Sequence, residues 1–212
     1  MEFTQWLGIA VLCAMGAMSP GLSFAVIVQQ TFNFGRRSGV MAALAHGVGI
    51  GLYAFITVMG LSVILVNNDW VYQILRWLGI LFLIYLAIKL FLADPPSESE
   101  INHHPHSTNA FNAQVMAAKS IRNGFLIAFL NPKVALFFIA LFSQVIQPDF
   151  TPTDKSVIVA TAAGVDAVWY SLVALGFSQT FILQSFKKYQ SSFNRVFSAV
   201  LILTAVTFAI SK

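Results

Sequence analysis

Six long apolar runs, separated by polar connectors, constrain the fold of this chain more than any other feature of its sequence. The runs cover residues 6–32, 40–66, 71–93, 125–146, 157–183 and 193–210. A helix of about 20 residues crosses the ~30 Å hydrocarbon core of a bilayer, so each run is long enough to span a membrane. The pattern predicts an all-α integral membrane protein with six transmembrane helices.

The scarcity of charge excludes the alternative of a soluble globule. Hydrophobic residues make up 58% of the 212 residues and charged residues 9%, against roughly 25% charged in an ordinary soluble domain. So few polar groups cannot cover the surface of a small globule, and the apolar excess must face lipid. No basic residue precedes the first run, which is therefore predicted to be a retained span and not a cleaved signal peptide.

Basic residues in the connectors predict the orientation. With six spans, eight Lys and Arg residues fall on one side of the membrane and three on the other. Because Lys and Arg collect in cytoplasmic loops, both termini are expected on the non-cytoplasmic side. The net charge of +4 is then a topology signal, and no nucleic-acid partner is predicted.

The longest connector divides the chain into two similar halves. Residues 94–122 are predicted to be a cytoplasmic polar linker between a three-helix repeat at 1–93 and a second at 123–212. Ser19-Pro20-Gly21 and Asn131-Pro132-Lys133 lie 112 residues apart, each in the middle of its run. Since each half has an odd number of spans, the two repeats must be inverted, an architecture typical of secondary transporters.

Both centres place a helix-capping residue directly before a proline. This pairing is favoured where a helix begins, so it predicts a helix that breaks and restarts in the membrane. The restarted helices would point their positive N-terminal ends at a shared cavity and stabilise a carboxylate there. The alternative is a pair of simple proline kinks filled by neighbouring helices. The recurrence at matched positions favours the cavity.

Lys133 and Asp166 are the only full charges deep inside the runs. An unpaired charge at that depth costs at least a few kcal/mol, so both are expected to face the protein interior. Lys133 suits a substrate carboxylate, and Asp166 could meet a substrate ammonium or take up a proton. The alternative is a permanent Lys133–Asp166 ion pair that fixes the helices.

His46 lies in the second run and could relay a proton, because imidazole titrates near neutral pH. The competing interpretation is a neutral histidine hydrogen-bonded to another helix. Gly47, Gly51 and Gly164 are expected to allow close helix approach.

No enzyme is predicted, because the chain carries no HExxH motif, no Cys-His cluster and no nucleotide-binding loop. No cofactor and no metal site is predicted either. The histidines at 103, 104 and 106 could bind a metal weakly, but in this Pro-containing polar stretch a solvated linker is the favoured interpretation.

The ordered set of motifs resembles the lysine exporter (LysE/RhtB type) family of amino-acid efflux transporters. The resemblance covers essentially the whole chain and is carried by residues 18–21, 35–39, 45–49, 130–133 and 166–170. Where the family usually has a second proline, this chain has Leu22. The resemblance implies an inner-membrane exporter of amino acids or related small metabolites, driven by the proton motive force. It also gives functional weight to Pro20, Gly21, Asn131, Pro132 and Lys133.

The sequence therefore predicts a proton-coupled exporter of small amino acids, embedded in the cytoplasmic membrane. Asp166 and His46 are the candidates for proton coupling. A cation or heavy-metal exporter and a non-transporting membrane scaffold are the alternatives, and formation of a homo-oligomer stays open. The predicted substrate-binding residues are Ser19, Pro20, Gly21, Asn131, Pro132, Lys133 and Asp166.

Overall fold

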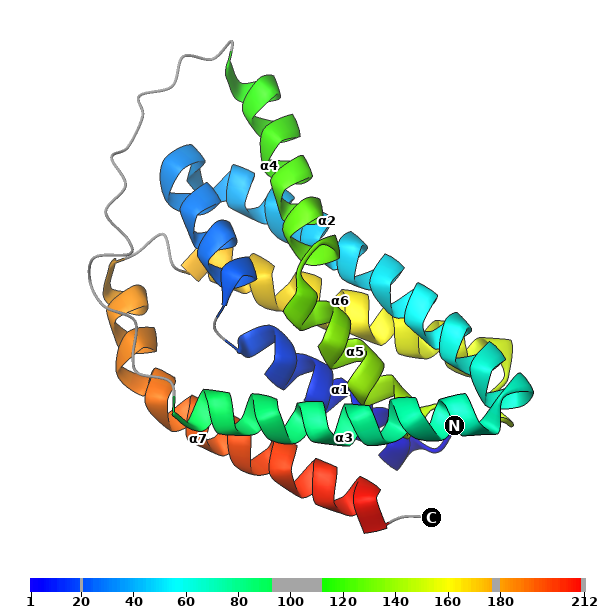
Figure 1. The fold of residues 1–212 in the computed structure, drawn as a ribbon. Helices are drawn as coiled ribbons and strands as arrows, with labels where there is room; N and C mark the ends of the chain where they lie inside the picture. The colour runs from blue at the N-terminus through cyan, green and yellow to red at the C-terminus, as the bar shows by residue number, and fades with distance from the viewer. Residues whose placement is uncertain (20, 93–111, 177–179, 211–212) are drawn as a thin grey trace.

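The computed structural model describes residues 1–19, 21–92, 112–176 and 180–210 (Figure 1). Within these ranges the chain forms seven helices and no strand, which confirms the all-α prediction. The helices are α1 (Phe3–Met18), α2 (Leu22–Asn67), α3 (Asp69–Phe91), α4 (Asn112–Phe129), α5 (Pro132–Val145), α6 (Pro152–Gly176) and α7 (Thr180–Ile210).

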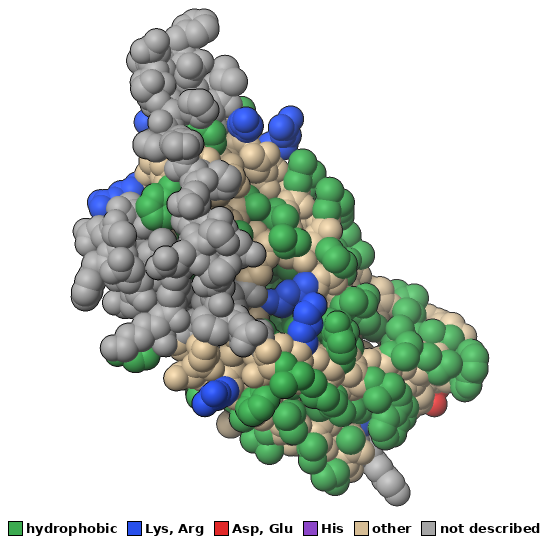
Figure 2. Space-filling view, turned by 60° about the vertical axis from the view of Figure 1, so that its left-hand side comes forward, with side chains coloured by type: hydrophobic (Ala, Val, Ile, Leu, Met, Phe, Trp, Pro, Cys, Tyr) green, Lys and Arg blue, Asp and Glu red, His purple; other side chains and the backbone are tan. Residues whose placement is uncertain are grey.

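Four helical stretches are long and apolar enough to cross a membrane among the described residues, or five if the bent pair α4 and α5 is one span. The shorter α1 is also apolar. Large hydrophobic side chains such as Leu78, Leu172 and Leu203 are exposed, and green side chains cover much of the described surface in Figure 2. The chain is thus a multi-pass membrane protein whose apolar exterior suits lipid.

The first two apolar runs are separated by a kink at Gly35. The element α2 is therefore two consecutive helices, and residues 33–38, predicted as a polar connector, contain the turn between them. Gly35 interrupts α2 with a φ of 82°, in the left-handed region that glycine adopts without a Cβ clash. The resulting kink turns the helix back on itself (Figure 1).

The helix α4 begins at Asn112, inside the stretch predicted as linker up to residue 122. The segment from 112 to 122 contains three alanines together with Gln, Met, Lys and Arg, which all favour helix. The histidine cluster at 103–106 lies outside the described residues.

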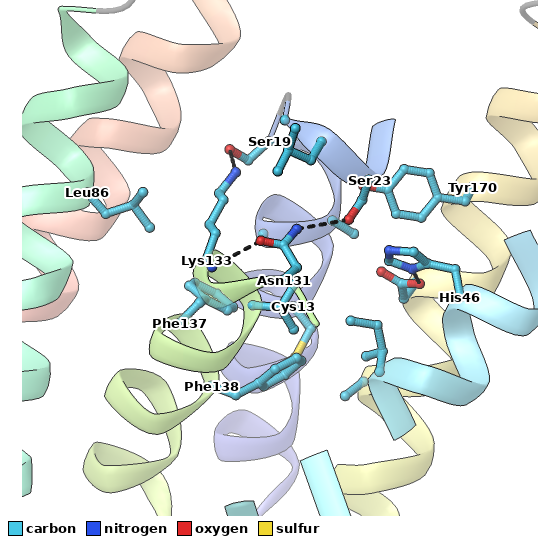
Figure 3. A pocket seen from close by; sticks show the side chains of 18 of the residues that line it. Cys13, Ser19, Ser23, His46, Leu86, Asn131, Lys133, Phe137, Phe138 and Tyr170 are labelled. Carbon is cyan, nitrogen blue, oxygen red and sulfur yellow. Dashed lines mark hydrogen bonds and ion pairs between the residues drawn. The ribbon is translucent and has the colours of Figure 1, made fainter. Parts of the chain in front are cut away.

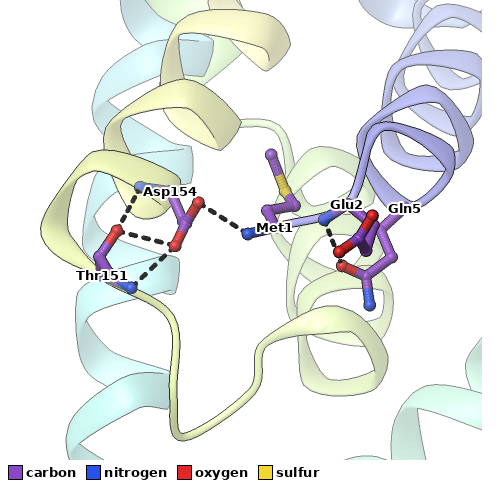
Figure 4. A network of polar contacts seen from close by, with 5 residues as sticks. All are labelled: Met1, Glu2, Gln5, Thr151 and Asp154. Carbon is purple, nitrogen blue, oxygen red and sulfur yellow. Dashed lines mark hydrogen bonds and ion pairs between the residues drawn. The ribbon is translucent and has the colours of Figure 1, made fainter.

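A network of polar contacts caps the N-terminus of α6 (Figure 4). Thr151 and Asp154 satisfy each other's backbone N–H groups, with the Thr151 N–H donating to Asp154 Oδ2 at 2.9 Å. The amino group of Met1 donates to Asp154 Oδ1 at 3.0 Å. One turn into α1, Trp6 Nε1 donates to Thr161 Oγ1 at 2.9 Å. These contacts hold α1 against α6.

Both predicted centres interrupt a helix. Between Met18 and Leu22, which we call the first break, Ser19 is extended with φ −65° and ψ 120°. Between Phe129 and Pro132, the second break, the two helices meet at a bend of 49°. Asn131 accepts a hydrogen bond from the Lys133 N–H at 3.0 Å, so it caps α5, and Pro132 follows in the first turn. The prediction of helices that break and restart is confirmed.

Glycines let α2 approach α4 and α6 closely. A Cβ placed on Gly47 would lie 2.6 Å from the Ala167 Cβ of α6, and one on Gly49 would lie 2.8 Å from the Ala128 Cβ of α4. Gly51 is also close to α6. The prediction for Gly164 is wrong, since a Cβ there would meet no atom within 4 Å. Gly164 is exposed and not at a helix contact.

Substituting Gly47 by alanine is expected to destabilise the protein by about 1 to 3 kcal/mol, because the added methyl overpacks the contact of α2 with α6. Gly60→Ala in the same helix is the control. Its Cβ would meet no atom within 4 Å, so helix propensity predicts no loss. Thermal denaturation of both variants in detergent measures the difference. Equal stability of the two variants would contradict the packing account.

Removal of the α5 cap by Asn131→Ala is expected to lower stability by about 1 to 2 kcal/mol. Asn131→Ser restores a capping oxygen and is expected to recover part of that loss. Asn68 occupies the same position before α3 but makes no capping bond, so Asn68→Ala is the matched control and should change stability little. The melting temperatures of the three variants test this expectation. A loss of stability in Asn68→Ala equal to that in Asn131→Ala would refute the stabilising role of the Asn131 cap.

Candidate functional site

A cavity lies between the two helix breaks (Figure 3). Its enclosed volume is small, about 50 Å³, and residues of α1, α2, α3, α5, α6 and α7 line it. Like most ligand sites, it has a few polar groups in a mainly apolar lining. The polar lining residues are Ser19, Ser23, His46, Asn131, Lys133, Asp166 and Tyr170.

Lys133 joins the second break to the first. It lies in the first turn of α5, and its ammonium donates a hydrogen bond to Ser19 Oγ at 2.8 Å (Figure 3). A Cβ on Gly21 would lie 3.5 Å from Lys133 Nζ, so the lysine passes close to the backbone of the first break. A positive group therefore lies beside the starts of α2 and α5, where the helix dipoles favour negative charge.

Asn131 makes the second connection between the breaks. Its side-chain oxygen caps α5, and its Nδ2 donates to Ser23 Oγ at 3.2 Å (Figure 3). Asn131 is 5% exposed and Ser23 is 6% exposed. Buried polar groups of this kind require partners, and here each break supplies the partners of the other.

His46 and Asp166 form the other polar feature of the cavity. The two side chains are buried, and His46 Nδ1 lies 2.6 Å from Asp166 Oδ2. With an ionised carboxylate the imidazole donates from Nδ1, whereas a protonated carboxyl can donate to an unprotonated Nδ1. The Tyr170 ring packs against the imidazole with 4.7 Å between ring centroids. His46 Nε2 has no hydrogen-bond partner among the described residues.

Six of the eight predicted residues line this one cavity. They are Ser19, Gly21, His46, Asn131, Lys133 and Asp166. Pro132 is exposed and is not among the lining residues, and Pro20 lies outside the described residues.

The two intramembrane charges have separate partners. Asp166 bonds to His46, and Lys133 bonds to Ser19, so the structure does not contain the direct Lys133–Asp166 ion pair that was the structural alternative. His46 is hydrogen-bonded to another helix, since its partner Asp166 belongs to α6.

Sequence reasoning missed several lining residues. Ser23 is the second residue of α2, directly after the first break, and a polar side chain beside a predicted helix start could have been identified from the sequence. The apolar lining residues carry no such signal, because side chains such as Phe137 and Leu86 look the same in sequence whether they line a cavity or a core.

Comparisons with known proteins identify relatives over most of the chain. The sequence profile described as LysE type translocator matches residues 14–212. The chain is 24% identical over 201 residues to the uncharacterized membrane protein YrhP of Bacillus subtilis strain 168, covering 94% of this chain and 93% of YrhP.

Two relatives are described as efflux proteins. The chain is 25% identical over 172 residues to the threonine efflux protein of Escherichia coli K12, with 80% of each chain covered. It is 24% identical over 148 residues to the homoserine/homoserine lactone efflux protein of Salmonella typhimurium LT2, covering 70% of this chain and 68% of that protein. No solved structure matches the chain significantly. A profile match over nearly the whole length, including both breaks, shows that the chain belongs to the LysE type translocator family and is a membrane transporter, not an enzyme.

Proposed function

We propose that the chain exports amino acids or related small metabolites across the cytoplasmic membrane by proton antiport. The observation that carries the proposal is the shared cavity, which has an ammonium group at the two helix breaks and a carboxylate–imidazole pair apart from it. The relatives described as threonine and homoserine efflux proteins support this substrate class. A zwitterionic substrate carries the two charges that complement these groups.

The proposed architecture is six spans in two inverted repeats of three helices. The first repeat, residues 1–93, would contain a broken span of α1 and the start of α2, then the remainder of α2, then α3. The second, residues 123–212, would contain the bent span of α4 and α5, then α6 and α7, with 94–122 as the connecting segment. The kink at Gly35 supports this division, because it separates α2 into two parts. Both termini would be non-cytoplasmic.

The substrate carboxylate would bind at the breaks. Lys133 presents its ammonium there, and a carboxylate could replace the Ser19 hydroxyl as its partner. Backbone N–H groups at the starts of α2 and α5 lie in the same region, so Gly21 and the prolines would act through backbone geometry. Asn131 would hold the two breaks in register through Ser23.

Proton coupling would reside in the His46–Asp166 pair. An ionised Asp166 attracts the substrate ammonium, and its protonation removes that attraction. His46 lies 2.6 Å from this carboxylate and has a second ring nitrogen, so it can pass a proton to or from Asp166. Binding of a proton from outside would then favour substrate release, and loss of that proton inside would favour binding of the next substrate.

The two alternatives differ from this proposal in what they require. A metal exporter needs several oxygen, nitrogen or sulfur ligands around one ion, and no group of three such side chains placed for this occurs in the described part of the chain. A scaffold would tolerate neutral replacements of Lys133 and Asp166 that preserve the fold. Formation of a homo-oligomer stays a prediction.

Lys133→Ala is expected to reduce amino-acid flux at least tenfold, because the variant loses the charge that meets the carboxylate. The measurement is efflux of labelled L-leucine and L-threonine from proteoliposomes of the full chain. Lys155→Ala, which removes a lysine from the start of α6, is the control and should keep normal flux. Normal flux in the Lys133 variant would refute the carboxylate role.

Asp166→Asn is expected to separate exchange from coupling. The variant cannot take up the coupling proton, so flux driven by a pH gradient should fall at least tenfold. The rate at which labelled substrate exchanges for unlabelled substrate at equal pH should fall less. His46→Gln should show the same pattern more weakly. Asp149→Asn changes an exposed carboxylate in the same way and is the control. A full response of the Asp166 variant to the pH gradient would exclude Asp166 as the coupling group.

A further inference from the structure

The inference concerns the side chain of the substrate and rests on the proposed function. We propose that the cavity selects neutral α-amino acids with an apolar side chain and discriminates against amino acids whose side chain is cationic or hydroxylated.

The charges around the cavity match one zwitterion. Among the described lining residues, Asp166 is the single acidic side chain and Lys133 the single lysine. Asp166 already accepts the contact with His46 through Oδ2. The ammonium and carboxylate of an α-amino acid therefore use the available charges. A second ammonium, as in lysine, would enter without a carboxylate to meet it.

The Lys133 ammonium adds to this discrimination. A cationic side chain near the breaks would be repelled by it, and repulsion in a partly buried region is screened less than at the surface.

An apolar wall lies beside the polar groups. Leu86, Phe137, Phe138 and Phe197 line the cavity from α3, α5 and α7, and each is at most 7% exposed. In Figure 3 Leu86 and the two labelled phenylalanines lie on one side of the cavity, while Ser23, His46 and Tyr170 lie on the opposite side. A substrate whose charged groups lie between Lys133 and Asp166 would direct its side chain toward this wall.

The apolar wall offers a substrate hydroxyl no partner. The wall side chains carry only carbon atoms, and the Ser23 hydroxyl on the opposite side already bonds to Asn131. A substrate hydroxyl against the wall would lose its water and meet carbon atoms instead of a partner. A hydrophobic site rejects an added hydroxyl only by about 10²-fold at most, so weaker discrimination is expected here than against a second charge.

The test uses isosteric pairs of amino acids. Proteoliposomes of the full chain, loaded with unlabelled L-leucine, take up labelled L-leucine by exchange, and external competitors are titrated against that uptake. L-Norleucine matches the chain of L-lysine without its ammonium, and L-valine matches L-threonine without its hydroxyl. Norleucine is expected to inhibit at a concentration at least tenfold below that of lysine, and valine at about threefold to tenfold below that of threonine.

A variant tests the cause of the discrimination. Val134 lines the cavity and occupies the third position of α5, where an acidic residue also suits the helix dipole. Val134→Asp supplies the missing carboxylate and is expected to reduce the preference for norleucine over lysine at least fivefold. Val134→Asn has the same shape without the charge and should keep the preference against lysine.

Three results would overturn the inference. Equal inhibition by lysine and norleucine, or by threonine and valine, in the unmodified protein would refute the selectivity. An unchanged norleucine preference in Val134→Asp, with exchange intact, would refute its electrostatic cause. Absence of exchange with every amino acid would overturn the proposed function as well, so the two failures are distinguishable.

Discussion

The need to satisfy polar groups inside a membrane governs this structure. A helix that breaks in the hydrocarbon region exposes backbone and side-chain polar atoms that no water can solvate, and each unsatisfied group costs several kcal/mol. The two breaks solve this problem for each other. Lys133 bonds to Ser19 and Asn131 bonds to Ser23, so the segments from the two halves of the chain must meet. The cavity lies where they do.

Close helix packing determines the other polar feature of the cavity. Gly47 brings α2 against Ala163 and Ala167 of α6, and a side chain there would force the helices apart. His46 precedes Gly47 on α2, and Asp166 precedes Ala167 on α6. The 2.6 Å contact between the His46 imidazole and the Asp166 carboxylate therefore depends on Gly47, a residue with no predicted role in binding. Small residues at this interface have the same role as in other membrane helix pairs, where they permit close backbone approach.

Sequence reasoning succeeded where the physics is local and failed where it depends on distant contacts. The breaks were predictable, because Asn131 and Pro132 have the chemistry of a helix start wherever they occur. The interior position of Asp166 followed from the cost of burying charge. Its partner did not, because only a pairing with Lys133 was considered, whereas the packing of α2 on α6 brings His46 to it. The division at the 33–38 connector was predicted, but the helical conformation of the residues on both sides of Gly35 was not, because they are polar and resemble a loop in sequence.

In the proposed transporter, the separation of the two charges would allow the cavity to bind and release a zwitterion. A direct ion pair between Lys133 and Asp166 would have to be broken by each substrate, at the cost of exposing two buried charges. The structure instead gives Lys133 a neutral hydroxyl and gives Asp166 an imidazole. Hydrogen bonds to neutral partners are weaker than those between opposite charges. In the proposed transporter, a carboxylate can therefore replace Ser19 with a net gain, and protonation at the His46–Asp166 pair can reverse the attraction for the ammonium without disturbing the breaks.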